Sequence, residues 1–243
     1  MIAPGTTISK SQPSNSWIRT PIVLFDVEGT LVDAVPLTLR SWKETLSEFG
    51  HDVSLVSLQR LCGMDGRDML AQLFPELTDD AASRILKSQG KRYRSQYLPQ
   101  VQPFPRVGDL FAALRNAGKS IGLATDCSRD ELDHYLDLTG VRDFIAASAC
   151  GDEADHGKPH PDLLRLVLKK LGARPRDTVM IGDTPFDVLA ARSVDAPAVG
   201  LLTGGFQDGD LTKVGAKAVL PDIGALIGKF RPLSRPPRDR RAS

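Results

Sequence analysis

The chain has 243 residues, 41% of them hydrophobic and 25% charged, and its formal net charge is +1. This length allows one sizeable core, or a core domain with a smaller insert, and the balanced charge gives no overall field that would favour nucleic acid or a membrane surface. No apolar run approaches the roughly 18 residues that a membrane span needs, and the polar start of the chain lacks the pattern of a secretory signal.

The two ends of the chain have compositions that cannot bury a core. Residues 1–19 are polar, with scattered Ser, Thr and Pro, and residues 231–243 are rich in Pro and Arg. We expect both segments to be disordered tails, the second of them basic. The cysteines, Cys62, Cys127 and Cys150, are few and odd in number and lack metal-ligand spacing. This usage favours a reducing cytoplasm over a compartment in which disulfides form.

Between the tails, short apolar runs alternate with amphipathic stretches. The runs with the character of buried parallel strands are IVLF (22–25), SIGLAT (120–125), FIAASA (144–149), TVMIG (178–182) and APAVGLL (196–202). Apolar faces at helical spacing lie between them, for example over residues 107–114 and 163–171. This alternation predicts an α/β fold with a doubly wound, Rossmann-like parallel sheet and helices on both faces.

The connection after the first run is far too long for a simple loop. It covers roughly ninety residues, whereas the loops of such units usually take about 2–6 residues outside the helix. Within it, apolar residues recur at helical spacing, beginning with Leu39 and Trp42. We therefore predict a helical cap domain over residues 35–102, inserted into a core domain formed by residues 20–34 and 103–230.

Side chains that suit metal and phosphate chemistry follow several of these runs. In an open parallel sheet, groups that follow different strands meet at the carboxyl edge, where ligands bind. A cluster of carboxylates at one edge repels itself unless a cation sits within it, and hard oxygen ligands without histidine or thiolate suit Mg²⁺. The candidate residues, in chain order, are Asp26, Glu28, Thr125, Asp126, Lys158, Asp183 and Asp187.

Together these residue types favour phosphoryl transfer. A carboxylate such as Asp26 can attack phosphorus and form an aspartyl-phosphate, which water then hydrolyses. Thr125 and Lys158 offer a hydroxyl and an ammonium group for the remaining phosphoryl oxygens. Glu28, two residues after Asp26, can protonate the leaving oxygen and later activate water.

The same segments resemble the motifs of haloacid dehalogenase superfamily hydrolases. DVEGT is similar to the first motif, with Asp26 as the nucleophile, and GLAT to the second, with Thr125. HGKPHPD contains the third-motif lysine, Lys158, and GDTPFD contains the fourth-motif acids, Asp183 and Asp187. The motifs occur in order and at suitable spacing. The resemblance implies a phosphatase-like hydrolase with an α-helical cap inserted after the first motif.

The resemblance also implies roles for particular residues. Mg²⁺ would be held by the carboxylates of Asp26 and Asp183 and by the backbone carbonyl of Glu28. Asp187 would be a further ligand or would lie beside one. A cap loop in such enzymes faces the active site and selects the substrate. Here that loop is GMDGR, and Arg67 within it is expected to meet an anionic group of the substrate.

Two departures from the family pattern bear on catalysis. The family's phosphatases usually carry Asp where this chain has Glu28, which is one methylene longer, and acid–base geometry is sensitive to shifts of about 1 Å. We nevertheless expect Glu28 to keep the acid–base role. Asp126 adds a carboxylate after Thr125 and is placed with the phosphate-binding residues, although its charge weakens phosphate binding unless it points away. Tyr93 and Tyr97, in the insert, are expected to pack.

The leading prediction is that the protein is a Mg²⁺-dependent phosphomonoesterase that acts on a small phosphorylated metabolite. We expect a cytoplasmic monomer or homodimer, without nucleic-acid or membrane partners. The alternatives are a phosphomutase, a phosphonate hydrolase, a dehalogenase, or a non-catalytic phosphate-binding regulatory protein. The family's dehalogenases usually lack a carboxylate at the position of Glu28. Its phosphonate hydrolases need a Schiff-base lysine in the cap, for which Lys43, Lys87 and Lys91 are the candidates.

Overall fold

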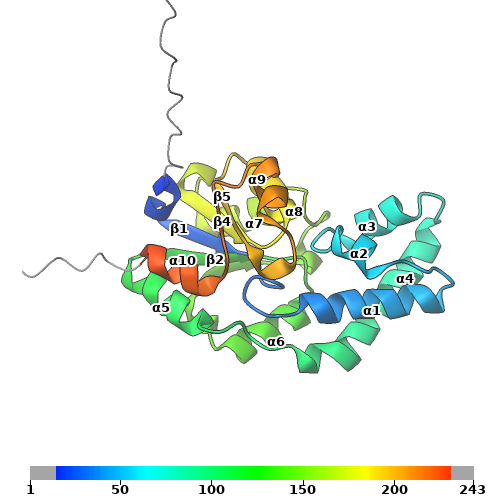
Figure 1. Cartoon of the computed structure of the whole chain (residues 1–243). Helices are drawn as coiled ribbons and strands as arrows, with labels where there is room; N and C mark the ends of the chain where they lie inside the picture. Colours follow the sequence, from blue (N-terminus) through cyan, green and yellow to red (C-terminus); the bar gives the residue numbers. More distant parts are fainter. Residues whose placement is uncertain (1–14, 231–243) are drawn as a thin grey trace, which may run out of the picture.

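The core of the computed structural model, which describes residues 15–230, is one sheet of six parallel strands in the spatial order β3-β2-β1-β4-β5-β6 (Figure 1). The strands are β1 (Ile22–Phe25), β2 (Ser120–Ala124), β3 (Ile145–Ala149), β4 (Thr178–Gly182), β5 (Ala198–Leu201) and β6 (Ala218–Leu220). The order reverses between β1 and β4, because the chain moves outward from β1 through β2 and β3 and then crosses back. The predicted doubly wound α/β fold is therefore confirmed.

The side chains of the central strands alternate between two hydrophobic clusters, one on each face of the sheet. Val23 and Phe25 of β1 belong to one cluster, whereas Leu24 belongs to the other together with Met180 of β4. All four side chains are fully buried. A strand that is covered on both faces needs apolar residues at every position, which explains the continuous apolar runs in the sequence.

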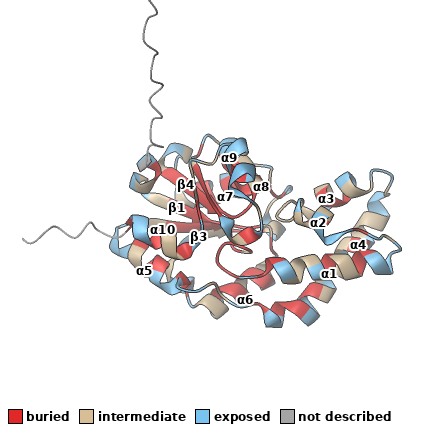
Figure 2. Cartoon of the chain, viewed as in Figure 1, coloured by how far each residue is buried: buried red, intermediate tan, exposed pale blue. Residues whose placement is uncertain are grey.

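Helices cover both faces of the sheet and complete three layers (Figures 1 and 2). The cluster that contains Phe25 also contains apolar residues of α5 (Val107–Asn116), α6 (Arg129–Thr139) and α10 (Ile223–Phe230). The cluster that contains Leu24 also contains apolar residues of α7 (Asp162–Leu171), α8 (Pro185–Arg192) and α9 (Asp208–Val214). Short 3-10 helices connect these elements: η4 (Arg142–Phe144), η5 (Gly151–Glu153), η6 (Pro175–Asp177) and η7 (Leu202–Gly204).

The segment between β1 and α5 is helical and forms a lobe beside the sheet (Figure 1). Its elements are α1 (Val35–Glu48), α2 (Leu55–Gln59), α3 (Gly66–Leu73), α4 (Asp79–Arg92), the π-helix η2 (Tyr93–Tyr97) and the 3-10 helix η3 (Leu98–Gln100). The lobe has a hydrophobic cluster of its own, which includes Trp42, Leu46 and Ile85. Tyr93 and Leu98 instead join the cluster of the sheet. The exact limits of a separate cap domain, residues 35–102, stay a prediction.

The structure departs from the sequence predictions near both ends of the described chain. Residues predicted to lie in the first tail form the 3-10 helix η1 (Asn15–Arg19), and Trp17 within it is buried with its ring 6.0 Å from that of Phe230. The predicted tail is therefore wrong for these residues, because a single large aromatic side chain anchors a polar segment. β6 was not predicted, since its three residues are too few for a recognisable pattern. The remaining predicted tail positions, 1–14 and 231–243, lie outside the described residues.

Among residues 15–230, no helix is long and apolar enough to cross a membrane.

The register of the central strands decides which loop residues meet. Phe25 pairs with Leu123 of β2 and with Ile181 of β4. Asp26 follows Phe25 directly, and Thr125 and Asp183 each follow the paired residue by two positions. Because the strands are parallel, these three side chains emerge at the same carboxyl edge of the sheet.

Candidate active site

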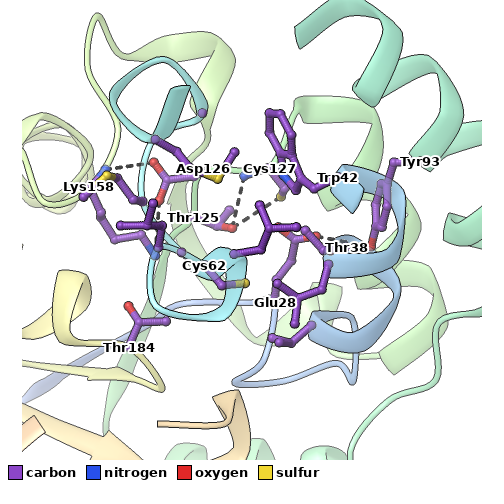
Figure 3. Close-up of a pocket in the computed structure, with 18 of the residues that line it drawn as sticks. Glu28, Thr38, Trp42, Cys62, Tyr93, Thr125, Asp126, Cys127, Lys158 and Thr184 are labelled. Carbon is purple, nitrogen blue, oxygen red and sulfur yellow. Dashed lines mark hydrogen bonds and ion pairs between the residues drawn. The ribbon is translucent and has the colours of Figure 1, made fainter. Parts of the chain in front are cut away.

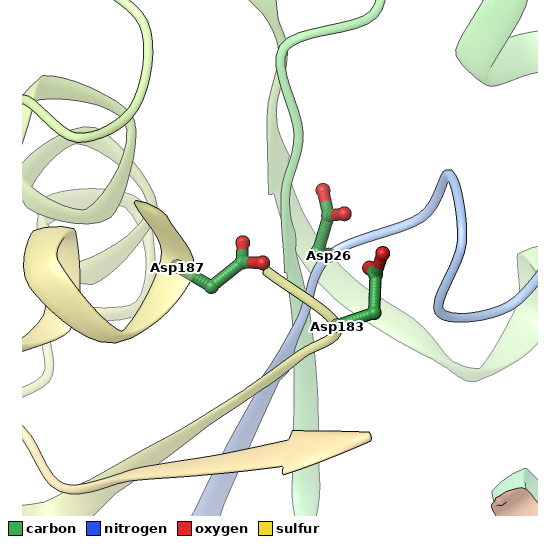
Figure 4. Close-up of side chains that lie close together, drawn as sticks. All are labelled: Asp26, Asp183 and Asp187. Atoms are coloured by element: carbon green, nitrogen blue, oxygen red, sulfur yellow. The ribbon is translucent and has the colours of Figure 1, made fainter. Parts of the chain in front are cut away.

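Three buried carboxylates lie together where β1 and β4 end (Figure 4). One oxygen from each of Asp26, Asp183 and Asp187 lies within 4.8 Å of the oxygens from the other two. The side chains of Asp26 and Asp183 thus lie close together, as the sequence predicted. Such spacing is close to that of oxygen ligands around one small divalent cation.

The carboxylate of Asp183 sits in a space that two glycines leave open. Its Oδ1 accepts a hydrogen bond from the hydroxyl of Thr30 over 2.6 Å, while its Oδ2 is buried and has no hydrogen-bond partner within the described residues. A Cβ at Gly29 would lie 2.2 Å from Oδ2, and a Cβ at Gly204 only 1.8 Å from it. Gly29 also has a positive φ of 79°, which favours glycine. The site therefore holds an unpartnered carboxyl oxygen, which suits a cation such as Mg²⁺.

The electrostatics of the cluster point the same way. Burial raises the pKa of Asp26 to about 7, although the charge of Lys158 opposes the shift. Burial, followed by the charges of Asp26 and Asp187, holds the pKa of Asp183 well above its usual range. Carboxylates that share a buried site disfavour one another's charged forms. A divalent cation would remove this penalty, so the donor set fits the ion expected from the sequence.

Lys158 is buried and joins two of the three acids. It lies in the segment between η5 and α7, and its Nζ donates to Asp26 Oδ1 over 2.6 Å and to Asp187 Oδ1 over 2.7 Å. A weaker ion pair links it to Asp126 Oδ2 at 3.4 Å. Burial lowers the pKa of the Lys158 ammonium, but these three carboxylates outweigh burial and raise it well above the usual value. Lys158 is therefore a permanent cation at the rim.

Asp126 fastens the loop that carries Lys158. Its Oδ1 accepts a hydrogen bond from the backbone amide of Lys158 over 2.9 Å. A Cβ at Gly157 would lie 2.0 Å from this oxygen, so the glycine allows the loop to approach. Burial raises the pKa of Asp126 to about 6, and Lys158 opposes that shift. The carboxylate that was expected among the phosphate ligands thus engages the loop backbone.

Thr125 lines the cavity of the site, whereas Asp187 is not among its lining residues. Thr125 is buried, and its side chain is among those that line the cavity described below (Figure 3). Asp187 Oδ2 accepts hydrogen bonds from the backbone amide of Thr184 over 3.0 Å and from its hydroxyl over 2.7 Å. Thr184 in turn accepts from the Asp187 amide, which closes a capping box at the start of α8. Asp187 is therefore held behind the cavity wall.

The side chain of Glu28 is bound by two tyrosine hydroxyls from different parts of the fold. Tyr135 of α6 donates to Glu28 Oε1 over 2.8 Å, and Tyr93 of η2 donates to the same oxygen over 3.3 Å. The two hydroxyls also lie 2.6 Å apart. Burial and then the charge of Glu131 raise the pKa of Glu28 to about 8, although both tyrosine hydrogen bonds lower it. The carboxyl group is therefore largely protonated at neutral pH.

Sequence reasoning missed both tyrosines as site residues. Tyr93 was expected only to pack; it is 3% exposed, as expected, but it also bonds to Glu28. Tyr135 was not singled out, because nothing in its local pattern distinguishes it from a core residue of an amphipathic helix. It stands 107 positions from Glu28 in the sequence, so only the docking of α6 against the sheet brings the two together.

A cavity of about 240 Å³ lies between the rim and the helical lobe (Figure 3). Its floor includes Asp26, Glu28 and Lys158. The lobe is joined to the core by hydrogen bonds to core backbone carbonyls: the Asp65 amide donates to the carbonyl of Lys158 over 2.9 Å, and the side-chain Nε2 of Gln59 donates to the carbonyl of Gly204 over 2.8 Å. The cavity is therefore shared by the sheet edge and the lobe.

Arg67 does not lie where the sequence placed it. Its side chain is exposed at the start of α3, and it is not among the residues that line the cavity. The structure therefore gives no support to a contact between Arg67 and the substrate, and that contact stays a prediction. Asp65 caps this helix, with Oδ1 accepting from the Arg67 amide over 2.7 Å, and this cap directs the loop backbone, not the guanidinium group, toward the core.

Comparisons with known proteins agree with the fold and identify the family. The sequence profile described as haloacid dehalogenase-like hydrolase matches residues 23–201. A phosphoglycolate phosphatase from Xylella fastidiosa is 31% identical over 192 residues, which are 79% of this chain and 83% of the relative. A pyrophosphatase, PpaX, from Oceanobacillus iheyensis is 29% identical over 175 residues, which are 72% of this chain and 79% of the relative. The crystal structure of a hydrolase from Pseudomonas syringae has 32% identity and a TM-score of 0.80, with 85% of this chain and 96% of that one covered.

Proposed function

The chain belongs to the haloacid dehalogenase-like hydrolase family, and on that premise we propose that this enzyme is a Mg²⁺-dependent phosphatase of a small phosphorylated metabolite. The observation that carries the proposal is the convergence of Asp26, Lys158 and Asp183 at one buried rim. The relatives named above support hydrolysis at phosphorus, since one is a phosphoglycolate phosphatase and another a pyrophosphatase.

Asp26 is the proposed nucleophile. Lys158 holds its Oδ1, which leaves Oδ2 to attack phosphorus. The new bond joins this oxygen to phosphorus, and the bond between phosphorus and the ester oxygen breaks. Lys158 and Thr125 both line the cavity, and their ammonium and hydroxyl groups would bind the phosphoryl oxygens during this step. Water then attacks the aspartyl-phosphate, and the Asp26 carboxylate is restored as phosphate leaves.

Glu28 is the proposed acid and base. Both tyrosine hydrogen bonds fall on its Oε1, so Oε2 is the oxygen that carries the proton. In the first step this proton passes to the departing ester oxygen, and in the second Glu28 takes a proton from the attacking water. Tyr93 and Tyr135 act as positioning residues, because they hold the longer glutamate side chain in one orientation.

The residues that would hold Mg²⁺ are Asp26 and Asp183 through their carboxylates and Glu28 through its backbone carbonyl. Bound there, the ion would shield the nucleophile from the charge of the phosphate dianion. Asp187 would act indirectly, because both of its oxygens already accept hydrogen bonds from Lys158 and Thr184. The unpartnered Oδ2 of Asp183 supports this assignment.

Other chemistries of the family are less well supported by the site. A phosphonate hydrolase needs a reactive lysine from the lobe, but within the described residues Lys43, Lys87 and Lys91 do not line the cavity. The carboxylate of Glu28 argues against a dehalogenase. A phosphomutase shares the proposed intermediate and differs only in that a substrate hydroxyl takes the place of water. A phosphate-binding regulatory protein would keep the geometry without turnover.

Hydrolysis of p-nitrophenyl phosphate, measured with and without Mg²⁺, tests the proposal. We expect Mg²⁺-dependent turnover that Asp26→Asn abolishes. The exposed Asp33, on the same loop, supplies the matched control, and Asp33→Asn should retain full activity. If phosphate binds but no turnover occurs at any Mg²⁺ concentration, the chain is a binding protein and the proposal fails.

A further inference from the structure

The wall of the cavity opposite the catalytic rim is apolar. Side chains from α1, α3, α4 and the α2–α3 connection supply it, among them Leu39, Trp42, Leu61, Met69 and Leu86. Most of them also belong to, or pack against, the lobe's own hydrophobic cluster. The part of a substrate that projects from the phosphate toward the lobe therefore meets hydrocarbon.

The charged groups around the cavity are almost all acidic. Within the described residues, the carboxylates that line it come from Asp26, Glu28, Asp126, Glu131 and Asp183, whereas Lys158 is its one lining cation. That ammonium already contacts three carboxylates. The positive charges of Lys158 and of a bound Mg²⁺ would be balanced by the rim carboxylates and by the phosphate of the substrate. Within the described lining, no cation is left for a second anionic group.

Two arginines of the lobe, Arg94 and Arg67, lie outside the cavity lining. Arg94 lies 3.5 Å from Glu131 Oε1, but its side chain is 46% exposed and is not part of the lining. Arg67 is exposed and also lies outside the lining. Glu131 itself accepts from the Ser128 amide over 2.8 Å in a capping box, which fixes its charge beside the cavity.

Resting on the proposed phosphatase function, we propose that the substrate is a phosphate monoester whose leaving group is small, uncharged and mainly apolar. A carboxylate or a second phosphate on the leaving group would be buried against Leu39 and Trp42 and would face the carboxylate of Glu131 without a counter-ion. Burying an unpaired charge in this way is strongly unfavourable. The relatives' named substrates, phosphoglycolate and pyrophosphate, carry such groups, so this chain differs from them in specificity.

The size of the leaving group is limited by the seating of the lobe. Cavities for drug-sized ligands usually measure about 300–1,000 Å³. This one is smaller, at about 240 Å³, and it must also hold the phosphoryl group. Gly63 of the lobe approaches Thr184 so closely that a Cβ there would lie 2.6 Å from Thr184 Cγ2. The lobe therefore cannot settle much deeper, and a chain of a few carbons or a single ring is what fits.

A matched pair of substrates tests the inference on the full chain with saturating Mg²⁺. Isobutyl phosphate has the shape of phosphoglycolate, with two methyl groups in place of the carboxylate oxygens. We expect kcat/KM for isobutyl phosphate to exceed that for phosphoglycolate, and for pyrophosphate, by at least about tenfold. Equal values, or a preference for either anionic substrate, would overturn the inference and leave the phosphatase function intact. If none of these compounds, nor p-nitrophenyl phosphate, is hydrolysed, the proposed function itself fails.

A charge added to the cavity gives a second test. Gln89 lines the cavity from α4, and Gln89→Lys would place an ammonium group in the wall. We expect this variant to narrow the ratio of kcat/KM for isobutyl phosphate over phosphoglycolate by about fivefold. Gln96→Lys, the same change at an exposed position of η2, is the matched control and should leave the ratio unchanged. An unchanged ratio in folded Gln89→Lys would count against the inference.

Discussion

The hydroxyl of Tyr135 donates a hydrogen bond to Oε1 of Glu28 over 2.8 Å, and so joins a helix of the core to the loop that follows the first strand. Under the proposed acid–base role of Glu28, this contact would explain how a glutamate can act where the family usually has an aspartate. The extra methylene lets the carboxyl group reach the tyrosine pair, and the hydroxyls then fix one of its two oxygens. The longer side chain is therefore held in a defined place.

Tyr135→Phe should shift the pH dependence of catalysis. The hydrogen bond stabilises the charged form of Glu28, so its loss raises the pKa of that carboxyl above its present value of about 8. An acid with a higher pKa stays protonated to higher pH. The alkaline limb of the pH profile of kcat/KM for an alkyl phosphate should therefore shift to higher pH. We also expect a loss of about tenfold at neutral pH, equivalent to roughly 1.5 kcal/mol.

Tyr97→Phe is the control for this experiment, because Tyr97 is another buried tyrosine, in η2, and its hydroxyl interacts with Glu44 and not with Glu28. Its alkaline limb should match that of the wild type at the same Mg²⁺ concentration. A Tyr135→Phe profile that falls in amplitude without moving along the pH axis would reduce Tyr135 to a packing residue.

Substitution of Glu28 should separate the acid role from binding. Glu28→Gln removes the transferable proton, and we expect a loss of about 10²–10⁴-fold in turnover of an alkyl phosphate. The loss should be much smaller for p-nitrophenyl phosphate, whose leaving group departs without protonation. Glu28→Asp should retain part of the activity, since it keeps the carboxyl group. Wild-type turnover of the alkyl ester by Glu28→Gln would show that another group supplies the proton.

Asp183→Asn should make the metal-free protein more stable. The carboxylate is buried, and one of its oxygens lacks a partner among the described residues. Asparagine has no carboxyl group to ionise, so it avoids the cost of a charge buried beside Asp26, and we expect the Tm without Mg²⁺ to rise by about 2–4 °C, equivalent to roughly 1 kcal/mol. Added Mg²⁺ should raise the Tm of the wild type but not that of the variant. Asp33→Asn should behave as wild type in both scans.

The same cluster gives the metal-free protein a stability that falls as the pH rises. The pKa of Asp26 is raised from 3.8 to about 7, so the folded state binds its proton more tightly than the unfolded state does. The contribution of Asp26 to the free energy of unfolding is therefore greatest at a pH below its pKa in the unfolded state, 3.8. This contribution is lost as the pH rises through its pKa in the folded state, about 7. Urea unfolding between pH 5 and pH 7 should show this loss in the wild type and a smaller one in Asp183→Asn. An identical slope in both proteins would contradict the coupling.

Gly63→Ala should impair activity by lifting the lobe from the rim. Gly63 has a φ of +87°, and its added Cβ would collide with Thr184. We expect kcat/KM to fall by about 100-fold, as for a displacement of about 1 Å near a catalytic site. Gly50→Ala is a close control, because Gly50 has a φ of +84° but nothing within 4 Å of the added atom. Both variants should lose roughly 1 kcal/mol of stability from backbone strain, yet only Gly63→Ala should lose activity. Equal activities would show that the Gly63 contact is dispensable.

The predictions from sequence were strongest where the physics is local. Strands buried on both faces must be apolar throughout, so the run of β4 was predicted with the bounds that the structure has. Thr184 directly before Pro185 is likewise a local pattern typical of a helix start, and the Thr184 side chain caps α8. The parallel arrangement of the sheet then brings Asp26, Thr125 and Asp183 to one edge, because their strands end at the same level.

What the sequence by itself determined is therefore the doubly wound core and the set of polar side chains at its carboxyl edge, since both follow from the period of apolar residues and from the ends of strands. Only the tertiary structure decided that Tyr135 and Tyr93 bind Glu28, that Asp126 fastens the Lys158 loop, and that Arg67 stays outside. It also decided that the cavity is apolar and acidic. These features depend on how helices pack together in the fold, since Tyr93 and Tyr135 stand 65 and 107 positions from Glu28 in the sequence. The local spacing of apolar residues carries no information about which side chains meet across two packed surfaces.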